Sequence, residues 1–156
     1  MKKVKKILAY VIVGLLFILK IKEKDGKIRE WQKNAMRYLV EMNLYDQWIF
    51  VHQDNKLICE YFHNKAIRSI AIYGMGKIGE RFYDELKNTD ITIKYIIDQK
   101  GGRICSDVNV ITLKDNFAEV DAIIVTPLFH FAEIKEKLSA KTDIPVISIE
   151  DVLYGI

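Results

Sequence analysis

Cysteine, proline and histidine are scarce in this chain, and common metal motifs and the P-loop motif are missing. Its 156 residues include two cysteines, two prolines and three histidines. Cys59 and Cys105 stand too far apart for a CxxC pair, and His52, His63 and His130 form no HExxH spacing. Neither GxxxxGKS nor GxxxxGKT occurs, which excludes a P-loop NTPase. These absences argue against a metal centre and a disulfide framework, and they favour two reduced thiols in a cytosolic protein.

Charge is distributed unevenly along the chain. Half of the residues are hydrophobic and 29% are charged, which is typical of a folded globular protein. Residues 1–30 hold nine Lys or Arg against three acids, so the totals of 24 and 21 leave 15 bases and 18 acids for residues 31–156. A basic segment on a mildly acidic body favours an anionic surface, such as lipid, as its partner. Nucleic acid is not predicted, because the body has no basic stripe interleaved with aromatic residues.

The first segment, residues 1–21, contains an uncharged apolar run flanked by lysines. The run extends from Ile7 to Leu19, and its thirteen residues fall short of the roughly 20 that a membrane-spanning helix needs. Two interpretations of this helix stay open: a short membrane anchor whose flanking lysines reach the headgroups, or a helix buried against a protein surface. A cleaved signal peptide is disfavoured, because charged residues follow the run where a small-residue cleavage site would stand. An anchor would place the protein in the cytoplasm, at the inner face of the cell membrane.

Residues 22–66 form a predicted helical region. It opens with a charged connector, Lys22–Arg29, in which Asp25-Gly26 indicates a turn. Apolar residues then recur at helical intervals, at Trp31, Ala35, Leu39, Met42 and Ile49. A second helix is predicted around Leu57–Phe62. At this helical spacing Trp31 and Trp48 are interpreted as core or helix-contact residues.

Residues 67–156 alternate apolar strands with helical patterns, which is the signature of βαβ units. Strands are predicted at 70–73, 91–97, 108–111, 122–125 and 145–148, and helices at 78–86 and 131–138. Right-handed crossovers then give a parallel sheet with the strand order 3-2-1-4-5. The predicted fold class is α/β, a Rossmann-like sheet preceded by N-terminal α-helices.

A glycine-rich sequence, Gly74-Met75-Gly76-Lys77-Ile78-Gly79, follows the first predicted strand and begins a predicted helix. In such a GxGxxG turn the first glycine permits the tight turn, the second lets the backbone approach a pyrophosphate, and the third brings helix and strand close together. The start of the helix would direct its unpaired amides at the phosphates. We therefore predict that these six residues bind a nucleotide.

Further candidate site residues stand at the ends of the second and fourth predicted strands. Asp98, 19 residues after Gly79, is placed to accept hydrogen bonds from a ribose 2′-hydroxyl and to repel a 2′-phosphate, which favours NAD over NADP. The alternative is that Asp98 only caps amides of the turn. Thr126 and Pro127 follow the fourth strand at the same edge of the sheet and complete the predicted site. His130 is interpreted as a helix-start residue, because no Ser, Cys or carboxylate stands close enough in sequence to form an evident pair with it; no catalytic residue is identified.

Three stretches carry a resemblance to a known family: Ser69 to Leu86, Tyr95-Ile-Ile-Asp-Gln, and Asp121-Ala-Ile-Ile-Val-Thr-Pro. Over residues 67–154 the chain looks like small Rossmann-like nucleotide-binding domains that accompany bacterial surface-polysaccharide and glycosyltransferase genes. The Val-Thr-Pro stretch is also similar to the cofactor half of sugar oxidoreductases of the glucose-fructose type. Those enzymes carry a catalytic lysine in a second domain, for which this chain has no room.

Three functions are consistent with these patterns. The first is an accessory module that binds NAD or a nucleotide-sugar and acts through a partner glycosyltransferase in surface-polysaccharide biosynthesis. The second is an NAD-dependent sugar oxidoreductase or epimerase-like enzyme that a homodimer completes. The third is a scaffold whose glycine turn stays empty. A methyltransferase fits less well, because the third glycine is spaced for GxGxxG rather than for the tighter GxGxG.

Overall fold

The computed structural model describes residues 2–54, 56–98 and 108–156, with the backbone alone for residue 2 and residues 4–13. The chain divides into two compact units, Met1–Met42 and Asn43–Ile156, each of which is described by itself. Cys105 lies outside the described residues, as do the side chains of much of the predicted apolar run.

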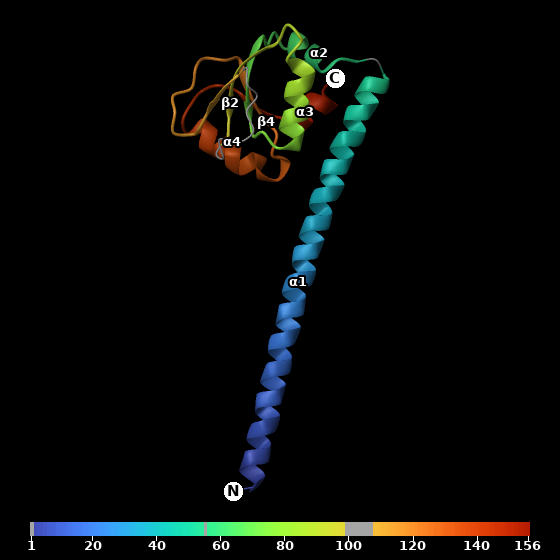
Figure 1. The fold of residues 1–156 in the computed structure, drawn as a ribbon, viewed down its shortest axis with the longest axis vertical. Coiled ribbons are helices and arrows are strands. Elements are labelled where there is room, and N and C mark those ends of the chain that lie inside the picture. The colour runs from blue at the N-terminus through green and yellow to red at the C-terminus, as the bar shows by residue number, and fades with distance from the viewer. Residues whose placement is uncertain (1, 55, 99–107) are drawn as a thin grey trace. The chain divides into compact units, whose positions relative to one another are not determined.

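One continuous helix, α1 (Lys2–Gln53), makes up the described part of the first unit and extends into the second (Figure 1). The turn predicted at Asp25-Gly26 is therefore wrong. A single glycine inside a helix costs only about 1 kcal/mol relative to alanine, and the residues around Gly26 are mostly strong helix formers. Lys27 Nζ also pairs with Glu23 Oε1 at 2.8 Å, one helical turn apart across the glycine.

The two tryptophans of α1 differ in burial. Trp48 is 6% exposed and packs in the core of the second unit, which confirms its interpretation as a core residue. Its indole Nε1 donates to Glu85 Oε2 at 2.6 Å, and its ring meets the edge of Phe82. Trp31 is 79% exposed, so its interpretation as a core residue is wrong, whereas a contact with another helix stays a prediction.

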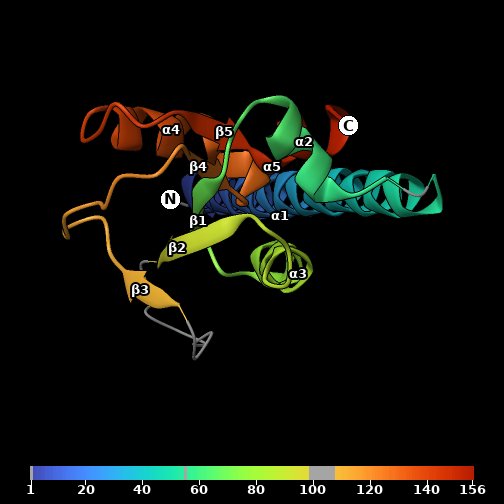
Figure 2. The same ribbon diagram turned by 90° about the horizontal axis from the view of Figure 1, so that it is seen from above.

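The second unit is built on a five-stranded parallel sheet, with the order β3-β2-β1-β4-β5 (Figure 2). This order and the α/β class confirm the prediction. The elements after α1 are α2 (Ile58–Asn64), β1 (Ser69–Tyr73), α3 (Lys77–Leu86), β2 (Thr92–Ile97), β3 (Asn109–Ile111), β4 (Ala122–Val125), a 3-10 turn η1 (Leu128–His130), α4 (Phe131–Ser139), β5 (Val146–Ser148) and α5 (Ile149–Tyr154). The sequence reading missed α5, whose start is fixed by a capping box between Ser148 and Asp151.

The sheet buries a different apolar cluster on each face. Successive strand residues point to opposite faces, so Ile70 and Ile72 of β1 belong to one cluster and Ala71 and Tyr73 to the other. The first cluster also contains residues of α2, α3, α5 and the end of α1, and the second contains residues of α4. This double coverage explains why the central strands β1 and β4 are apolar on both faces.

A carboxylate holds the edge of the sheet where β1 begins. Asp121, just before β4, accepts hydrogen bonds from the backbone amides of Arg68 at 2.9 Å and Ser69 at 2.7 Å, and from the Ser69 hydroxyl at 3.0 Å. These bonds, the Arg68 amide first, stabilise the ionised form and hold the pKa of Asp121 below its usual range. The contact therefore fixes the start of β1 beside β4.

Among the side chains that the structure describes, no helix offers an apolar stretch long enough to cross a membrane.

Candidate functional site

The three glycines of the turn between β1 and α3 have different surroundings. Gly74 has a φ of +91°, and a Cβ there would stand 2.8 Å from Cγ of Pro127. A Cβ on Gly79 would stand 2.1 Å from the carbonyl oxygen of Gly74, so only glycine lets α3 approach the turn this closely. Gly76 has an ordinary φ of −74°, and a Cβ there would meet nothing within 4 Å. Gly76 is thus the glycine that faces open space.

Three hydrogen bonds to the ends of two neighbouring strands, β2 and β4, fix the backbone of this turn. The amide of Gly74 donates to the carbonyl of Ile97 at 2.9 Å, and the hydroxyl of Thr126 donates to the carbonyl of Gly74 at 2.7 Å. The amide of Met75 donates to Oδ2 of Asp98 at 2.9 Å. Because residues at the ends of β2 and β4 hold the turn, its shape is set before any ligand arrives.

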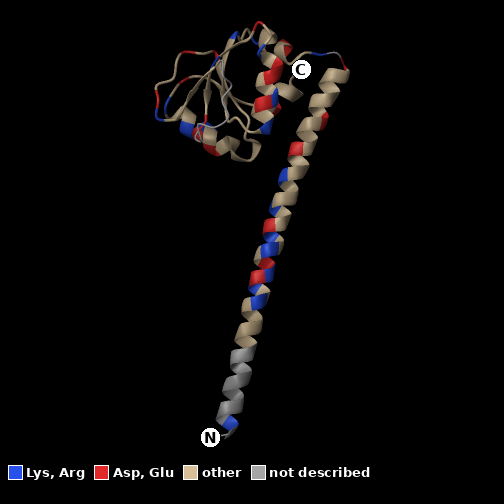
Figure 3. Cartoon of the chain, in the orientation of Figure 1, with Lys and Arg blue, Asp and Glu red and all other residues tan. Residues whose placement is uncertain are grey.

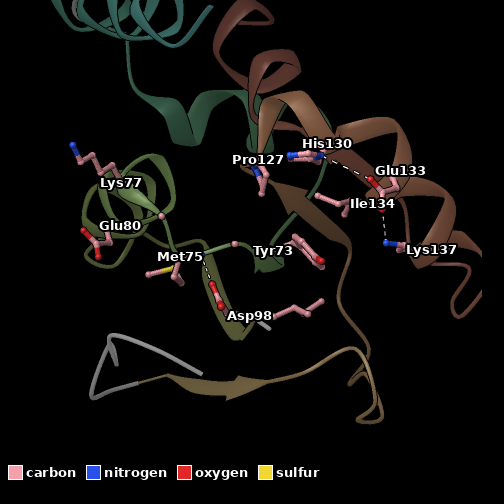
Figure 4. Close-up of a pocket in the computed structure, with 13 residues that line it drawn as sticks. Tyr73, Met75, Lys77, Glu80, Asp98, Pro127, His130, Glu133, Ile134 and Lys137 are labelled. Atoms are coloured by element: carbon pink, nitrogen blue, oxygen red, sulfur yellow. Dashed lines mark hydrogen bonds and ion pairs between the residues drawn. The ribbon is translucent and has the colours of Figure 1, made fainter. Parts of the chain in front are cut away.

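A cavity of about 950 Å³ opens beside the turn, at the carboxyl edge of the sheet (Figure 4). Ligands of open α/β sheets bind at this edge, and the volume lies within the range of small-molecule sites. One wall is formed by the turn and the first turn of α3, and the other by the start of α4. The lining residues are Tyr73, Gly74, Met75, Gly76, Lys77, Glu80, Ile97, Asp98, Pro127, His130, Glu133, Ile134 and Lys137.

The α3 wall presents the start of a helix to the cavity. Gly76 is the N-cap residue, and it has no side chain that could accept hydrogen bonds from the amides of the first helical turn. These amides and the helix dipole favour an anion, and Lys77 adds a positive charge at the same position, while Glu80 adds a negative charge one turn later.

The α4 wall carries a row of polar side chains. Lys137 Nζ donates to Glu133 Oε1 at 2.6 Å, and His130 Nδ1 lies 3.8 Å from Glu133 Oε2 (Figure 4). The expectation that no nearby carboxylate pairs with His130 is therefore wrong, because Glu133 stands one helical turn away. The hydrogen bond from Lys137 lowers the pKa of Glu133, and the same bond raises the pKa of Lys137, so both side chains are charged at neutral pH.

The predicted site residues divide into two groups. Six of them line the cavity: Gly74, Met75, Gly76, Lys77, Asp98 and Pro127. The other three support the turn from behind: Ile78 packs against the core, Gly79 contacts the Gly74 carbonyl, and Thr126 is 3% exposed beneath the turn. The Asp98 carboxylate accepts a hydrogen bond from the Met75 amide, which is the contact that the alternative to ribose binding predicts.

The sequence reading did not assign the α4 wall to the site. His130, Glu133, Ile134 and Lys137 follow one another at i, i+3, i+4 and i+7, which places them on one helix face. This spacing was visible in the sequence, but it does not say what the face meets. Tyr73, Ile97 and Glu80 were also missed as lining residues.

Away from the cavity, the described titratable side chains include no metal cluster and no exposed thiol. Across the described residues, no three or more His, Cys, Asp and Glu side chains gather as they would around a metal ion. Cys59 is buried in the core, and this burial is the main cause that raises the pKa of its thiol. A thiol in this environment is a weak nucleophile.

A family model matches the part of the chain that carries the cavity. The model of the family described as C2185-like, N-terminal, matches residues 64–149, which are 86 of the 156 residues. The matched range contains all five strands and the whole set of residues that line the cavity. No curated protein and no solved structure matches the chain.

Proposed function

The chain belongs to the C2185-like N-terminal family, and we propose that its α/β unit binds a nucleotide, either NAD or a nucleotide-sugar, at the turn from Gly74 to Gly79. One observation carries the proposal. Gly74 and Gly79 are required by the packing of the turn itself, whereas Gly76 faces the cavity with open space where a side chain would be. A glycine that the fold does not need, at the start of a helix, is what close approach of a pyrophosphate requires.

Asp98 has two tasks in this proposal. It accepts the Met75 amide with one oxygen and so fixes the turn. In the proposal the same carboxylate also accepts a hydrogen bond from a ribose hydroxyl of the ligand. A negative charge at this point disfavours a 2′-phosphate, and NAD is therefore preferred to NADP.

The α4 wall supports a ligand with two polar ends. The cavity extends from the amides at the start of α3 to His130, Glu133 and Lys137. Acceptor and donor groups at both ends suit a dinucleotide or a nucleotide-sugar, whose second sugar would meet the charged Glu133 and Lys137 side chains. A mononucleotide would use one end only.

In this proposal the chain is an accessory module of surface-polysaccharide biosynthesis. It holds the nucleotide in the cytoplasm, at the inner face of the membrane, and a partner glycosyltransferase performs the chemistry. The support is the resemblance of residues 67–154 to small domains that accompany such genes.

A second candidate is an NAD-dependent sugar oxidoreductase or epimerase-like enzyme, and one observation favours it. His130 lies on the cavity wall 3.8 Å from Glu133, and a histidine beside a carboxylate is a common acid-base arrangement. Turnover of nucleotide-sugars with NAD by the pure protein would select this candidate over the accessory module.

The decisive experiment is native mass spectrometry of the purified full-length protein, followed by titration with NAD and UDP-sugars. Two variants of Gly76 test whether the nucleotide binds at the glycine turn. Gly76→Ser and Gly76→Asp both supply an N-cap side chain to α3, but only aspartate adds a negative charge. We expect Gly76→Asp to lose binding by about tenfold more than Gly76→Ser, because the carboxylate opposes a phosphate at close range. Equal affinities for the two variants would contradict a phosphate beside Gly76, and no nucleotide binding by the wild type would leave the scaffold function.

A further inference from the structure

Helix α1 carries an exposed apolar stripe in the part that belongs to the first unit. From Ile28 onward its members recur every three and four residues, and Ile21 stands seven residues before Ile28. We call these residues the α1 stripe: Ile21, Ile28, Trp31, Ala35, Tyr38 and Met42. All six are exposed in the single chain, and Tyr38 reaches 73% and Ile28 54%. Large apolar side chains lined up along one helix face in this way mark a contact surface.

The other faces of residues 22–33 are charged, whereas the apolar residues Met36, Leu39 and Val40 lie outside the stripe nearer its end. Lys22, Glu23, Arg29, Glu30, Lys33 and Arg37 all occupy positions away from the stripe. Figure 3 shows these charges gathered in the middle of α1, between sections with few charges. A helix that is charged on its outer faces is not immersed in lipid, in contrast to the preceding Leu15–Leu19 section, which has no charge on any side.

The seven-residue repeat of the stripe indicates which kind of element it contacts. Ile21, Ile28, Ala35 and Met42 are seven residues apart, and Trp31 and Tyr38 follow three residues after two of them. A strict seven-residue repeat drifts around a straight helix by about 20° per heptad, and it stays in contact only when two helices wind around each other. The partner of the α1 stripe is therefore another helix with the same repeat.

We propose that this partner is the α1 stripe of a second copy of the chain, in a parallel two-stranded coiled coil over residues 21–42. In heptad terms Ile21 and Ile28 are a positions, Trp31 and Tyr38 are d positions, and a second copy supplies the same length and period. The proposal is independent of nucleotide binding.

The charges beside the stripe are compatible with this pairing. In a parallel coil each g residue lies near the e residue five positions later in the partner. The resulting pairs are Lys20 with Asp25, Lys27 with Gln32, and Asn34 with Leu39. The first pair is attractive and the others contain no like charges. Lys24 occupies the remaining d position, where the two copies of this residue face each other beside Asp25. A single polar residue in the seam lowers the stability of the pair but fixes the register of the two helices.

Disulfide cross-linking of the full-length protein in mild detergent tests both the pairing and its direction. Ile28→Cys and Met42→Cys introduce thiols at a positions, where a parallel coil brings the two copies within disulfide distance. Lys33→Cys is the matched control, because residue 33 is an f position on the outer face. The wild type, with Cys59 and Cys105 only, gives the background.

We expect disulfide dimers that join residue 28 to 28 and residue 42 to 42, at a yield about tenfold above the Lys33→Cys control, since a disulfide forms only within a Cα separation of about 7 Å. Cross-links of the control at the same yield, or links that require an antiparallel pair, would overturn the proposal.

Sedimentation of two charge variants gives a second, independent readout. Trp31→Glu places a carboxylate in the seam and should raise the dimer dissociation constant by about 100-fold, whereas Lys33→Glu should leave it unchanged. A monomeric wild type, or a Trp31→Glu variant that dimerises like the wild type, would refute the proposal. Quenching of Trp31 by brominated lipid in vesicles of a monomeric wild type would assign the stripe to the membrane instead.

Discussion

Alanine at Gly79 and alanine at Gly76 should change the stability of the α/β unit in different ways. Gly79 lies inside α3, where helix propensity alone predicts that Gly79→Ala stabilises the protein by about 1 kcal/mol. The structure predicts the opposite sign, because the new Cβ would stand 2.1 Å from the Gly74 carbonyl oxygen. To relieve this clash the Gly74 carbonyl must move away from the Thr126 hydroxyl, which donates a hydrogen bond to it at 2.7 Å.

The magnitude follows from these two contacts. Overpacking costs about 1 to 3 kcal/mol, and loss of one hydrogen bond adds about 0.5 to 1.5 kcal/mol, so Gly79→Ala should lower the free energy of unfolding by about 2 to 4 kcal/mol. Gly76→Ala should change it by less than about 0.5 kcal/mol, since nothing lies within 4 Å of its Cβ.

Urea unfolding of both variants, followed by near-ultraviolet circular dichroism, measures the difference. The two variants differ from the wild type by one methyl group each, so each serves as the control for the other. A Gly79→Ala variant as stable as the wild type, or a Gly76→Ala variant destabilised by more than about 1 kcal/mol, would refute the reasoning. The reasoning holds that packing requires a glycine at position 79 and leaves open space at position 76.

Three further predictions concern Asp98, the tryptophans and acid stability. Asp98→Asn keeps an oxygen that can accept the Met75 amide but removes the charge, so the ratio of NADP to NAD affinity should rise by about tenfold in calorimetric titration; an unchanged ratio would contradict a role at the ribose. Trp48→Ala should lower the free energy of unfolding of the α/β unit by about 3 to 5 kcal/mol, whereas Trp31→Ala should leave it within about 0.5 kcal/mol, and similar urea midpoints for the two would disprove the difference in burial. Because the folded-state pKa of Asp121 is depressed, its contribution to stability is complete above the unfolded pKa of about 3.9 and is lost as the pH falls through the lower folded value. The difference in the free energy of unfolding between wild type and Asp121→Asn should therefore be constant from neutral pH to about pH 5 and should shrink in stronger acid. A difference that grows in stronger acid would contradict this prediction.

Local sequence patterns were sufficient to predict the strands and the glycine turn from Gly74 to Gly79. The short apolar runs before Gly74 and before Thr126 can satisfy their backbone and bury both faces only as central parallel strands, and right-handed crossovers then allow one order. The glycine spacing likewise identified which residues form the turn. What the spacing could not give was the task of each residue, because Thr126 and Asp98 act through hydrogen bonds to backbone groups about 52 and 23 residues away.

Periodicity along a helix shows that a face is apolar or polar, but it does not show what that face meets. Trp31 and Trp48 have the same helical signature, yet only Trp48 reaches the core beside Phe82 and Glu85. The sequence by itself determined the strand order, the turn and the helical start of the chain. The continuous helix at Gly26 depends on helix propensities summed over its neighbours, which outweigh a single turn signal. Only the tertiary structure decided that Trp48 joins the core and that the polar face of α4 forms the second wall of the cavity, because both depend on contacts between elements far apart in the chain.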